Sequence, residues 1–289
     1  MTMPDIEQVL DSIRINQGII LSTLNKSSVS RNLQDFEFKV FSQFGEDGII
    51  QHLLDAVDIK EKTFIEFGVE DFSESNCRFL LMKDNWKGFV IDGSSENIAR
   101  LQNAYYFWMY SLGALGAFIT RENINELLAK SGLGKDLGIL SVDVDGNDYH
   151  ILEQIRHFEP RILICEFNPL YGPVRKISTV YDPAFNRFRC HFTGKHYGAS
   201  LAAITWLANK KGYSLVGTNK TSHNAFFVRN DLINDKLEIL SPEQAYAPPK
   251  MRGSRDERGQ LVIRSYEEVL QIIKGLPVLN VETNEIEKL

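Results

Sequence analysis

The stretch KTFIEFGVEDFSESNCRFLLMKDNWKGFVID, residues 62–92, decides the fold. Thr63–Phe67 is a short run of β-branched and aromatic residues closed by a glycine, which predicts a buried strand followed by a tight turn. Segment 73–84 has helical spacing and a serine N-cap, and 88–91 predicts a second buried strand that ends at Asp92. A glycine turn, a helix and an acid after the next strand are the parts of a nucleotide site, because the acid can accept hydrogen bonds from both ribose hydroxyls.

Composition narrows the class of protein. The chain has 289 residues, of which 43% are hydrophobic, so we expect one large α/β domain with extensions. The net charge of −6 disfavours nucleic acid and membrane partners, which require a basic face. Three cysteines without metal-binding spacing and the lack of a long apolar run predict a soluble, cytoplasmic protein with reduced thiols.

The N-terminal region, 1–35, is expected to hold one helix and a polar linker. Ile6, Ile13 and Ile20 are seven residues apart, which indicates an amphipathic helix with a weak heptad pattern over 5–24. Two interpretations stay open: the helix packs on its own domain, or it forms a homo-oligomer contact.

Two further segments leave a structural and a functional interpretation open. In 41–57 a loop precedes a helix, and Glu46 and Asp47 are either capping acids of its first turn or, for Glu46 together with Gln43, residues that reach over the nucleotide site. The stretch 103–118 predicts the third strand, and its aromatic residues are either core or a stacking surface for an adenine ring.

Three acids cluster at the end of a predicted buried strand in 138–146 and just beyond it. Asp143, Asp145 and Asp148 stand where a parallel strand opens into the ligand crevice, and buried carboxylates are costly without partners. One of the three, Asp148, can be a cap of the following helix. We do not expect capping to explain all three.

The next predicted strand repeats this pattern, because 161–168 is apolar and ends with Glu166 and Asn168. Consecutive parallel strands carry their carboxyl ends to one edge of the sheet. Asp143, Asp145, Glu166 and Asn168 should therefore converge near the glycine turn. Such oxygen ligands suit Mg²⁺, Mn²⁺ or Ca²⁺.

The last third of the chain predicts a long loop, a helix, a hairpin and an extension. Residues 170–197 are rich in aromatic and basic side chains, which is typical of a substrate lid or, alternatively, a surface loop. The strands at Tyr213–Thr218 and 225–229 are close enough for an antiparallel hairpin. Residues 233–289 form the predicted C-terminal extension, with a flexible arm at 247–259 and a helix at 266–274.

Parallel strands alternating with helices and closed by an antiparallel hairpin resemble the class I S-adenosylmethionine-dependent methyltransferase fold. The chain resembles the FkbM-related group of that superfamily, over about residues 40–230. The motifs that carry the resemblance are SQFGEDGII, FIEFGV with a following SESN, GFVIDGS, LSVDVDGNDYHIL, ICEFNP, YGASLAAITWLANKKGYSLVGTN and NAFFV. The resemblance implies a Rossmann-like, doubly wound seven-stranded sheet in 36–232, with an antiparallel C-terminal hairpin.

The resemblance also implies an activity, namely transfer of a methyl group from S-adenosylmethionine to a hydroxyl of a sugar, a nucleotide sugar or a similar polar small molecule, assisted by Mg²⁺ or Mn²⁺. The residues implied in cofactor binding are Gln43, Glu46, Glu66, Gly68, Asn76, Asp92, Gly93, Ser94 and Asp143. The implied metal ligands are Asp143, Asp145, Glu166 and Asn168, and the candidate catalytic residues are Asp145, His150, His191 and His196.

One departure from the usual first motif bears on activity. Glu70 and Phe72 stand where a second and a third glycine would fall, and Glu70 adds negative charge near the cofactor. Two alternatives therefore stay open. One is a metal-independent methyltransferase that uses Asp143 and Asp145 as base and cofactor contact, and the other is a nucleotide-binding or scaffold protein that keeps the fold without catalysis.

Overall fold

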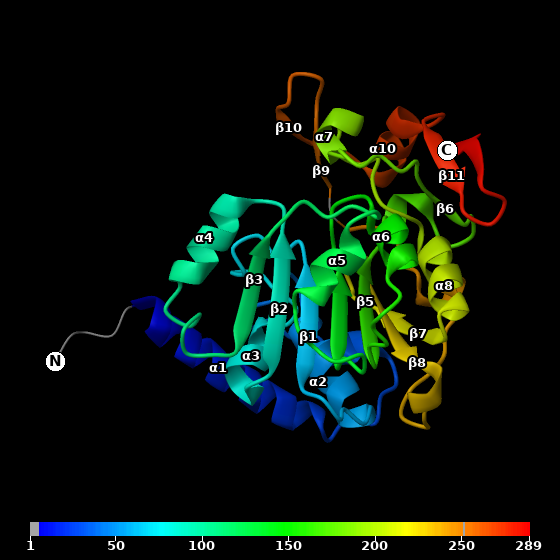
Figure 1. Ribbon diagram of the computed structural model, residues 1–289. Helices are drawn as coiled ribbons and strands as arrows, with labels where there is room; N and C mark the ends of the chain where they lie inside the picture. Colours follow the sequence, from blue (N-terminus) through cyan, green and yellow to red (C-terminus); the bar gives the residue numbers. More distant parts are fainter. Residues whose placement is uncertain (1–5, 251) are drawn as a thin grey trace.

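The computed structural model describes residues 6–250 and 252–289. Its main sheet has seven strands in the order β3-β2-β1-β4-β5-β8-β7 (Figure 1). Strands β1 to β5 are parallel, and β8 runs antiparallel to both β5 and β7. This is the predicted Rossmann-like α/β sheet of the class I methyltransferase fold, with its antiparallel hairpin at the end.

The elements of the described chain have the following bounds. The strands are β1 Thr63–Phe67, β2 Lys87–Asp92, β3 Leu112–Gly116, β4 Ile139–Val142, β5 Ile162–Glu166, β6 Ile177–Thr179, β7 Tyr213–Thr218, β8 Asn224–Arg229, β9 Gly253–Arg255, β10 Leu261–Ile263, β11 Pro277–Asn280 and β12 Glu285–Lys288. The α-helices are α1 Ile6–Asn25, α2 Glu46–Ala56, α3 Arg78–Asp84, α4 Ser95–Asn103, α5 Ile124–Ala129, α6 Asp148–Gln154, α7 Arg187–Cys190, α8 Leu201–Lys210, α9 Pro242–Ala245 and α10 Tyr266–Ile273. The 3₁₀ turns are η1 Leu33–Phe36, η2 Pro169–Tyr171 and η3 Asn230–Leu232. No helix among the described residues is long and apolar enough to cross a membrane.

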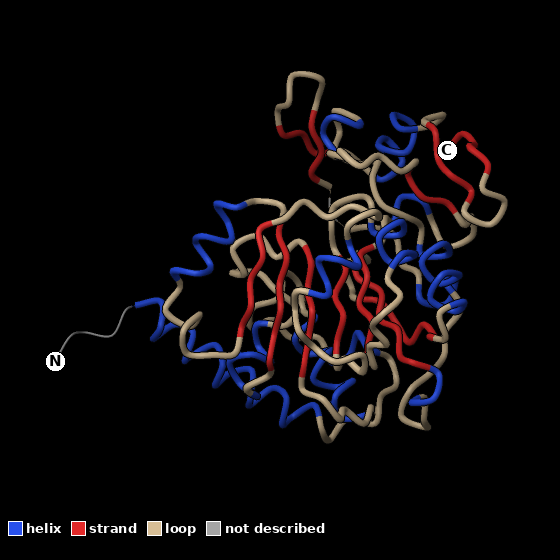
Figure 2. The backbone as a smooth tube through the Cα atoms, in the orientation of Figure 1, coloured by secondary structure: helices blue, strands red, loops and turns tan. Residues whose placement is uncertain are grey.

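Helices cover both faces of the sheet, as Figure 2 shows. Successive residues of a strand point to opposite faces, so Phe64 packs in the core formed with α2, α3 and α4, whereas Ile65 packs in the core formed with α5, α6 and α8. Burial on both faces explains why the parallel strands are continuous apolar runs.

The N-terminal helix α1 packs on its own domain through a polar and small-residue face. Asp11 is buried and accepts hydrogen bonds from Arg78 at 2.6 Å and from the Tyr105 hydroxyl at 2.9 Å. Gly18 is a close-approach position, because a Cβ there would lie 2.6 Å from the side chains of Phe79 and Val40. The helix is thus anchored to α3 by a buried ion pair.

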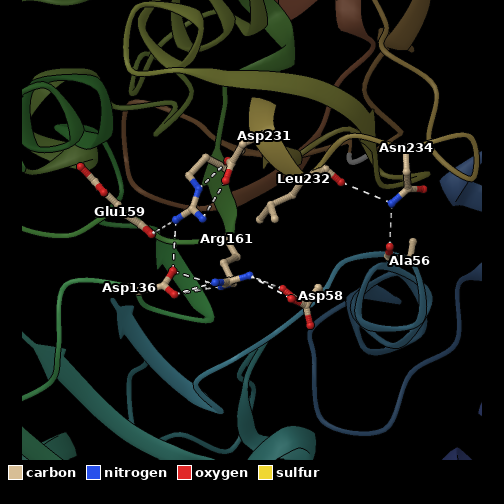
Figure 3. A network of polar contacts seen from close by, with 9 residues as sticks. Ala56, Asp58, Asp136, Glu159, Arg161, Asp231, Leu232 and Asn234 are labelled. Atoms are coloured by element: carbon tan, nitrogen blue, oxygen red, sulfur yellow. Dashed lines mark hydrogen bonds and ion pairs between the residues drawn. The ribbon is translucent and has the colours of Figure 1, made fainter.

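The sheet edge at the amino ends of the strands is held by an arginine network (Figure 3). Arg161, at the start of β5, donates to Asp136 at 2.6 Å and to the Asp58 carbonyl. Arg229, at the end of β8, donates to Asp136 and Asp231. Because these contacts tie together the ends of β1, β4, β5 and β8, this edge has a structural role, and the carboxyl ends are left for chemistry.

The start of helix α3 differs from the prediction because a side chain competes for backbone N–H groups. Helix α3 begins at Arg78 and not at residue 73, since the Glu66 carboxylate accepts the N–H groups of Asn76 and Cys77 that a helix would otherwise use.

The C-terminal extension covers the predicted lid. In Figure 1, β9, β10, α10 and β11 lie above the carboxyl edge of the sheet, together with α7 and β6 of 170–197. Strand β11 pairs antiparallel with β6 and with β12, so lid and extension share a three-stranded sheet. The prediction of one long loop over 170–197 was wrong, because β6 is short and pairs with β11 only about 100 residues later in the sequence.

Candidate functional site

A pocket of about 480 Å³ opens at the carboxyl edge of β1, β2, β4 and β5. Its size falls in the range of small-molecule and cofactor sites. It lies at the point where strand order reverses between β1 and β4, the usual ligand position in doubly wound sheets. The lining residues are Gln43, Glu66, Phe67, Gly68, Glu70, Glu74, Ser75, Asn76, Ile91, Asp92, Gly93, Phe118, Ile119, Asp143, Val144, Asp145, Asn147, Glu166, Phe185, Asn186, Arg187, Phe188 and Asn224.

The turn after β1 brings the backbone close to β4. Gly68 has φ of 66°, and a Cβ at this position would lie 1.8 Å from the carbonyl oxygen of Asp143. Glu70 and Phe72 have φ of 48° and 65°, the left-handed region that glycine favours. The chain therefore adopts a glycine-type turn with two non-glycine residues, at a local cost of order 1 kcal/mol each.

Glu66 organises the loop between β1 and α3. Its carboxylate accepts from the Ser75 hydroxyl at 2.6 Å, the Asn76 N–H at 2.7 Å and the Cys77 N–H at 3.1 Å. Burial raises the pKa of Glu66 to about 7. Asn76 also donates to the Ser141 hydroxyl, so this loop is attached to β4 as well.

Asp92, at the end of β2, turns its carboxylate toward the same loop. One oxygen accepts from the Glu70 N–H and the other from the Ser94 N–H, both at 2.8 Å. Each carboxylate oxygen keeps a second lone pair for a ligand hydroxyl. Gly93 lines the pocket, whereas the Ser94 hydroxyl caps α4 by accepting from the Asn97 N–H.

Three carboxylates meet on the opposite wall. Ligand oxygens of Asp143, Asp145 and Glu166 all lie within 4.8 Å of one another. Glu166 is only 8% exposed, and its Oε2 has no hydrogen-bond partner among the described residues. Burial raises the pKa of both Asp143 and Glu166 well above the ordinary range, and the neighbouring carboxylates raise them further. A divalent cation fits this arrangement, because it would satisfy the orphaned oxygen and the concentrated charge.

The third acid of the β4 loop holds that loop in place. Asp148 is the first residue of α6 and accepts from the N–H groups of Val144 at 2.8 Å and Gly146 at 3.0 Å. The prediction that it caps α6 was wrong, because the helix has no side-chain cap and the contacts of Asp148 go to the loop before it. Asp143 and Asp145 remain for the pocket.

Among the described residues that line the pocket, Arg187 of α7 is the one basic residue. Seven lining residues are acidic, namely Glu66, Glu70, Glu74, Asp92, Asp143, Asp145 and Glu166. The Arg187 guanidinium donates to Asp145 and lies over the Tyr197 ring, 4.2 Å from the centroid. The lid thus places a cation against the carboxylate cluster. The pocket as a whole favours a positively charged ligand.

Asn168 does not join the carboxylates, although it follows the same strand as Glu166. Its amide donates to the carbonyls of Lys195 and Tyr197, at 3.0 and 2.8 Å, and its oxygen accepts from the Leu170 N–H. The side chain is buried in the lid and caps η2, so the structure assigns it a structural role in place of the predicted metal contact.

The three predicted histidine bases are absent from the described lining of the pocket. His150 donates to the Thr179 carbonyl, and His191 contacts the Thr193 hydroxyl. His196 donates to the Pro277 carbonyl, and burial lowers its pKa to about 4. His150 thus ties α6 to β6, His191 makes a contact within 170–197, and His196 joins 170–197 to the C-terminal extension. These roles leave carboxylates as the candidate bases.

The two acids in the first turn of α2, Glu46 and Asp47, hold the loop that precedes the helix, so the prediction that they cap it was wrong: the helix has no side-chain cap. Asp47 accepts from the N–H groups of Val40, Phe41 and Ser42. Glu46 is fully buried and accepts from Asn219 and Asn224 through one oxygen and from the Phe44 and Gly45 N–H groups through the other. Of the two residues predicted to reach over the site, Gln43 lines the pocket and Glu46 does not.

Several lining residues were missed because no local pattern marks them. Phe118 follows β3 and Asn147 follows Gly146, and both were within segments already given other interpretations. Phe185, Arg187 and Phe188 come from the lid, where the excess of aromatic and basic residues was the available signal. Their positions depend on how the lid folds back.

We expect the metal-free protein to become less stable as pH rises from 6.5 to 8. Burial raises the pKa of Glu66 to about 7 and the pKa of Asp143 and Glu166 well above the ordinary value of about 4 for such carboxyls. A raised folded-state pKa gives stability that is present at low pH and lost as pH rises through that pKa. Buried histidines such as His196, with a lowered pKa of about 4, act in the opposite direction only below their ordinary pKa of about 6.5. Urea unfolding in EDTA at pH 6.5, 7, 7.5 and 8 measures this, and a free energy of unfolding that rises across the range would contradict it.

Several methyltransferases of solved structure are similar to this chain. Neither family models nor curated proteins gave a match. The N-terminal domain of EvdMO1, with SAH bound, is 12% identical over 78% of this chain and 96% of that one, with a TM-score of 0.42. An O-methyltransferase family protein from Burkholderia thailandensis is 10% identical over 64% of this chain and 57% of that one, with a TM-score of 0.40.

A third similar structure is the CurJ carbon methyltransferase, 11% identical over 68% of this chain and 56% of that one, with a TM-score of 0.40. The chain thus spans little more than half the length of the Burkholderia and CurJ proteins. At these identities the assignment of the fold rests on the strand order and not on the similarities.

Proposed function

We propose that this protein is an S-adenosylmethionine-dependent O-methyltransferase of the FkbM-related group, acting on a hydroxyl of a sugar or similar polar small molecule with the help of a divalent cation. The observation that carries the proposal is the meeting of Gly68, Asp92 and the carboxylates of Asp143, Asp145 and Glu166 in one pocket. These residues come from the ends of four strands.

The cofactor's parts match different walls of the pocket. Asp92 would accept the ribose hydroxyls, and Phe118, Ile119 and Val144 offer apolar surface for the adenine ring. The sulfonium of S-adenosylmethionine is a cation, and the excess of carboxylates favours it over an anionic nucleotide. The turn at Gly68 lets the backbone approach the ligand closely.

The carboxylate cluster supports a role in preparing the acceptor. Asp143, Asp145 and Glu166 would hold a Mg²⁺ or Mn²⁺ ion, which when bound would lower the pKa of an acceptor hydroxyl. Without the ion, the raised pKa of Asp143 or Glu166 would suit either side chain to take up the hydroxyl proton. Methyl transfer then requires mainly alignment of the hydroxyl oxygen with the donor.

The acceptor would enter past the lid. Phe185 and Phe188 stand at this side of the pocket, and Phe188 is 49% exposed. Exposed rings of this kind offer an apolar surface to the C–H face of a sugar, and Asn147 and Asn186 offer amides to its hydroxyls.

A metal-independent transferase is the second candidate, and the contact from Arg187 to Asp145 favours it. The guanidinium already supplies a cation to the cluster. Under this alternative, binding of S-adenosylmethionine and transfer would be unchanged by a chelator.

Calorimetric titration tests the proposed function. S-adenosylmethionine and S-adenosylhomocysteine should bind with micromolar dissociation constants, about −8 kcal/mol, while ATP should not bind to the acidic pocket. Absence of heat from S-adenosylmethionine, with and without Mg²⁺, would refute the proposal. Equal binding of ATP would contradict the role assigned to the carboxylates.

A further inference from the structure

The outer face of helix α1 is apolar, which inverts the usual arrangement of a surface helix. The residues that α1 buries are Asp11, Gly18 and Ser22. It exposes eight large aliphatic side chains to solvent, between 39% and 76% exposed. One of them, Ile19, lies on another side of the helix. The other seven are Ile6, Val9, Leu10, Ile13, Ile20, Leu21 and Leu24.

These seven residues form one continuous stripe. At 3.6 residues per turn they fall, together with Gln17, within an arc of about 120°. No charged residue lies within this arc. We call these eight positions the α1 stripe. The stripe presents on the order of 600 Å² of surface, at the upper end of what monomers expose and close to one partner's share of a standard interface.

We propose that the α1 stripe pairs with the same stripe of a second copy of this chain, in an antiparallel arrangement about a two-fold axis. The proposal goes beyond the proposed methyl transfer and does not depend on it.

The spacing of the stripe supports a second copy as the occupant. A two-fold antiparallel contact places residue i against residue 30 − i when the axis passes beside Ile15, the midpoint of the helix. Under this rule the stripe maps onto itself: Ile6 meets Leu24, Val9 meets Leu21, Leu10 meets Ile20 and Ile13 meets Gln17. Apolar side chains oppose apolar ones in three of these four pairs, and the amides of the two Gln17 lie near the axis.

Charge disfavours a membrane surface as the occupant. Helices that lie on membranes carry several lysines or arginines beside the apolar face. Helix α1 contains one basic residue, Arg14, which pairs with Asp11 at 3.5 Å. The position of α1 permits pairing, because it runs along the outside of α2 and α3 (Figure 1).

Light scattering after size exclusion, at about 10 μM protein, tests the proposal. The wild-type chain should have twice the mass of 33.0 kDa, and the Ile13→Glu/Ile20→Glu variant should have a dimer dissociation constant at least 100-fold higher. The matched control is Ser12→Glu/Thr23→Glu, which changes two exposed residues of α1 outside the stripe and should remain dimeric. Unchanged circular dichroism and melting would show that both variants fold.

Pairs of introduced cysteines test whether the two α1 helices run antiparallel. In a Cys190→Ser background, which removes the exposed thiol, an equal mixture of Ile6→Cys and Leu24→Cys chains should form a disulfide between chains. Either chain alone should not, because like positions would be about 27 Å apart along the helices. A monomeric wild type, a dimer that survives the glutamates, a cross-link between like positions, or monomers that bind phosphatidylserine vesicles through the stripe would each overturn the proposal.

Discussion

Gly68→Ala is expected to destabilise the protein by at least about 4 kcal/mol and to abolish binding of S-adenosylmethionine. The new Cβ would lie 1.8 Å from the Asp143 carbonyl oxygen, a backbone atom that can move only if β4 moves with it. The residue also has φ of 66°, which costs alanine about 1 kcal/mol or more. Urea unfolding and calorimetric titration measure the two effects.

Gly132→Ala is the matched control for this substitution. Gly132 has φ of 61°, but no atom lies within 4 Å of its added Cβ. The Gly132→Ala variant should therefore lose only about 1 kcal/mol of unfolding free energy, from backbone strain, and should bind the cofactor as the wild type does. Equal destabilisation by the two substitutions would show that the close approach of β1 and β4 does not matter.

Glu166→Gln is expected to weaken Mn²⁺ binding at least about 100-fold, because it replaces an anionic ligand in the most buried position of the cluster. Electron paramagnetic resonance of free Mn²⁺ during titration measures this directly, without knowledge of the acceptor. Glu153→Gln changes an exposed acid of α6 and serves as the control.

Arg187→Gln should move the affinity in the opposite direction. It removes the guanidinium that donates to Asp145, so the three carboxylates would bind Mn²⁺ more tightly. If neither the wild type nor this variant binds Mn²⁺, the metal-assisted proposal is refuted, and the metal-independent transferase and the protein without catalysis are the two alternatives that remain.

The sheet could be predicted because each parallel strand carries its own evidence. Thr63–Phe67 and the other buried strands are apolar runs that end in glycine or acids. Because such strands are buried on both faces, they can be recognised from their own residues, without knowledge of the strands with which they pair. For the same reason the sequence alone was enough to place Asp92 and Asp143 at the carboxyl edge.

Side-chain roles at that edge could be predicted less well. Asn168 and Glu166 follow the same strand, yet Asn168 turns into the lid because unpaired carbonyls there need its amide. His150 and His196 face the lid and the C-terminal strands, whose pairing with β6 no local pattern reveals. A residue of a suitable chemical type in the right segment is therefore not enough to predict a site residue. The direction in which its side chain points must also be known.

The structure also explains how a chain without the usual glycines keeps the turn after β1. Glu70 and Phe72 adopt left-handed backbone conformations, held by the contact from the Glu70 N–H to Asp92 and by burial of the Phe72 ring against Phe64. The two residues that replace the usual glycines therefore have backbone conformations that glycine favours.

A crystal structure of the protein soaked with S-adenosylhomocysteine and Mn²⁺ tests the central claim most directly. We predict density for the ribose against Asp92 and an anomalous Mn²⁺ peak among Asp143, Asp145 and Glu166. Density for the ligand elsewhere, or a pocket that stays empty at millimolar ligand, would contradict the assignment of this pocket as the methyl-transfer site.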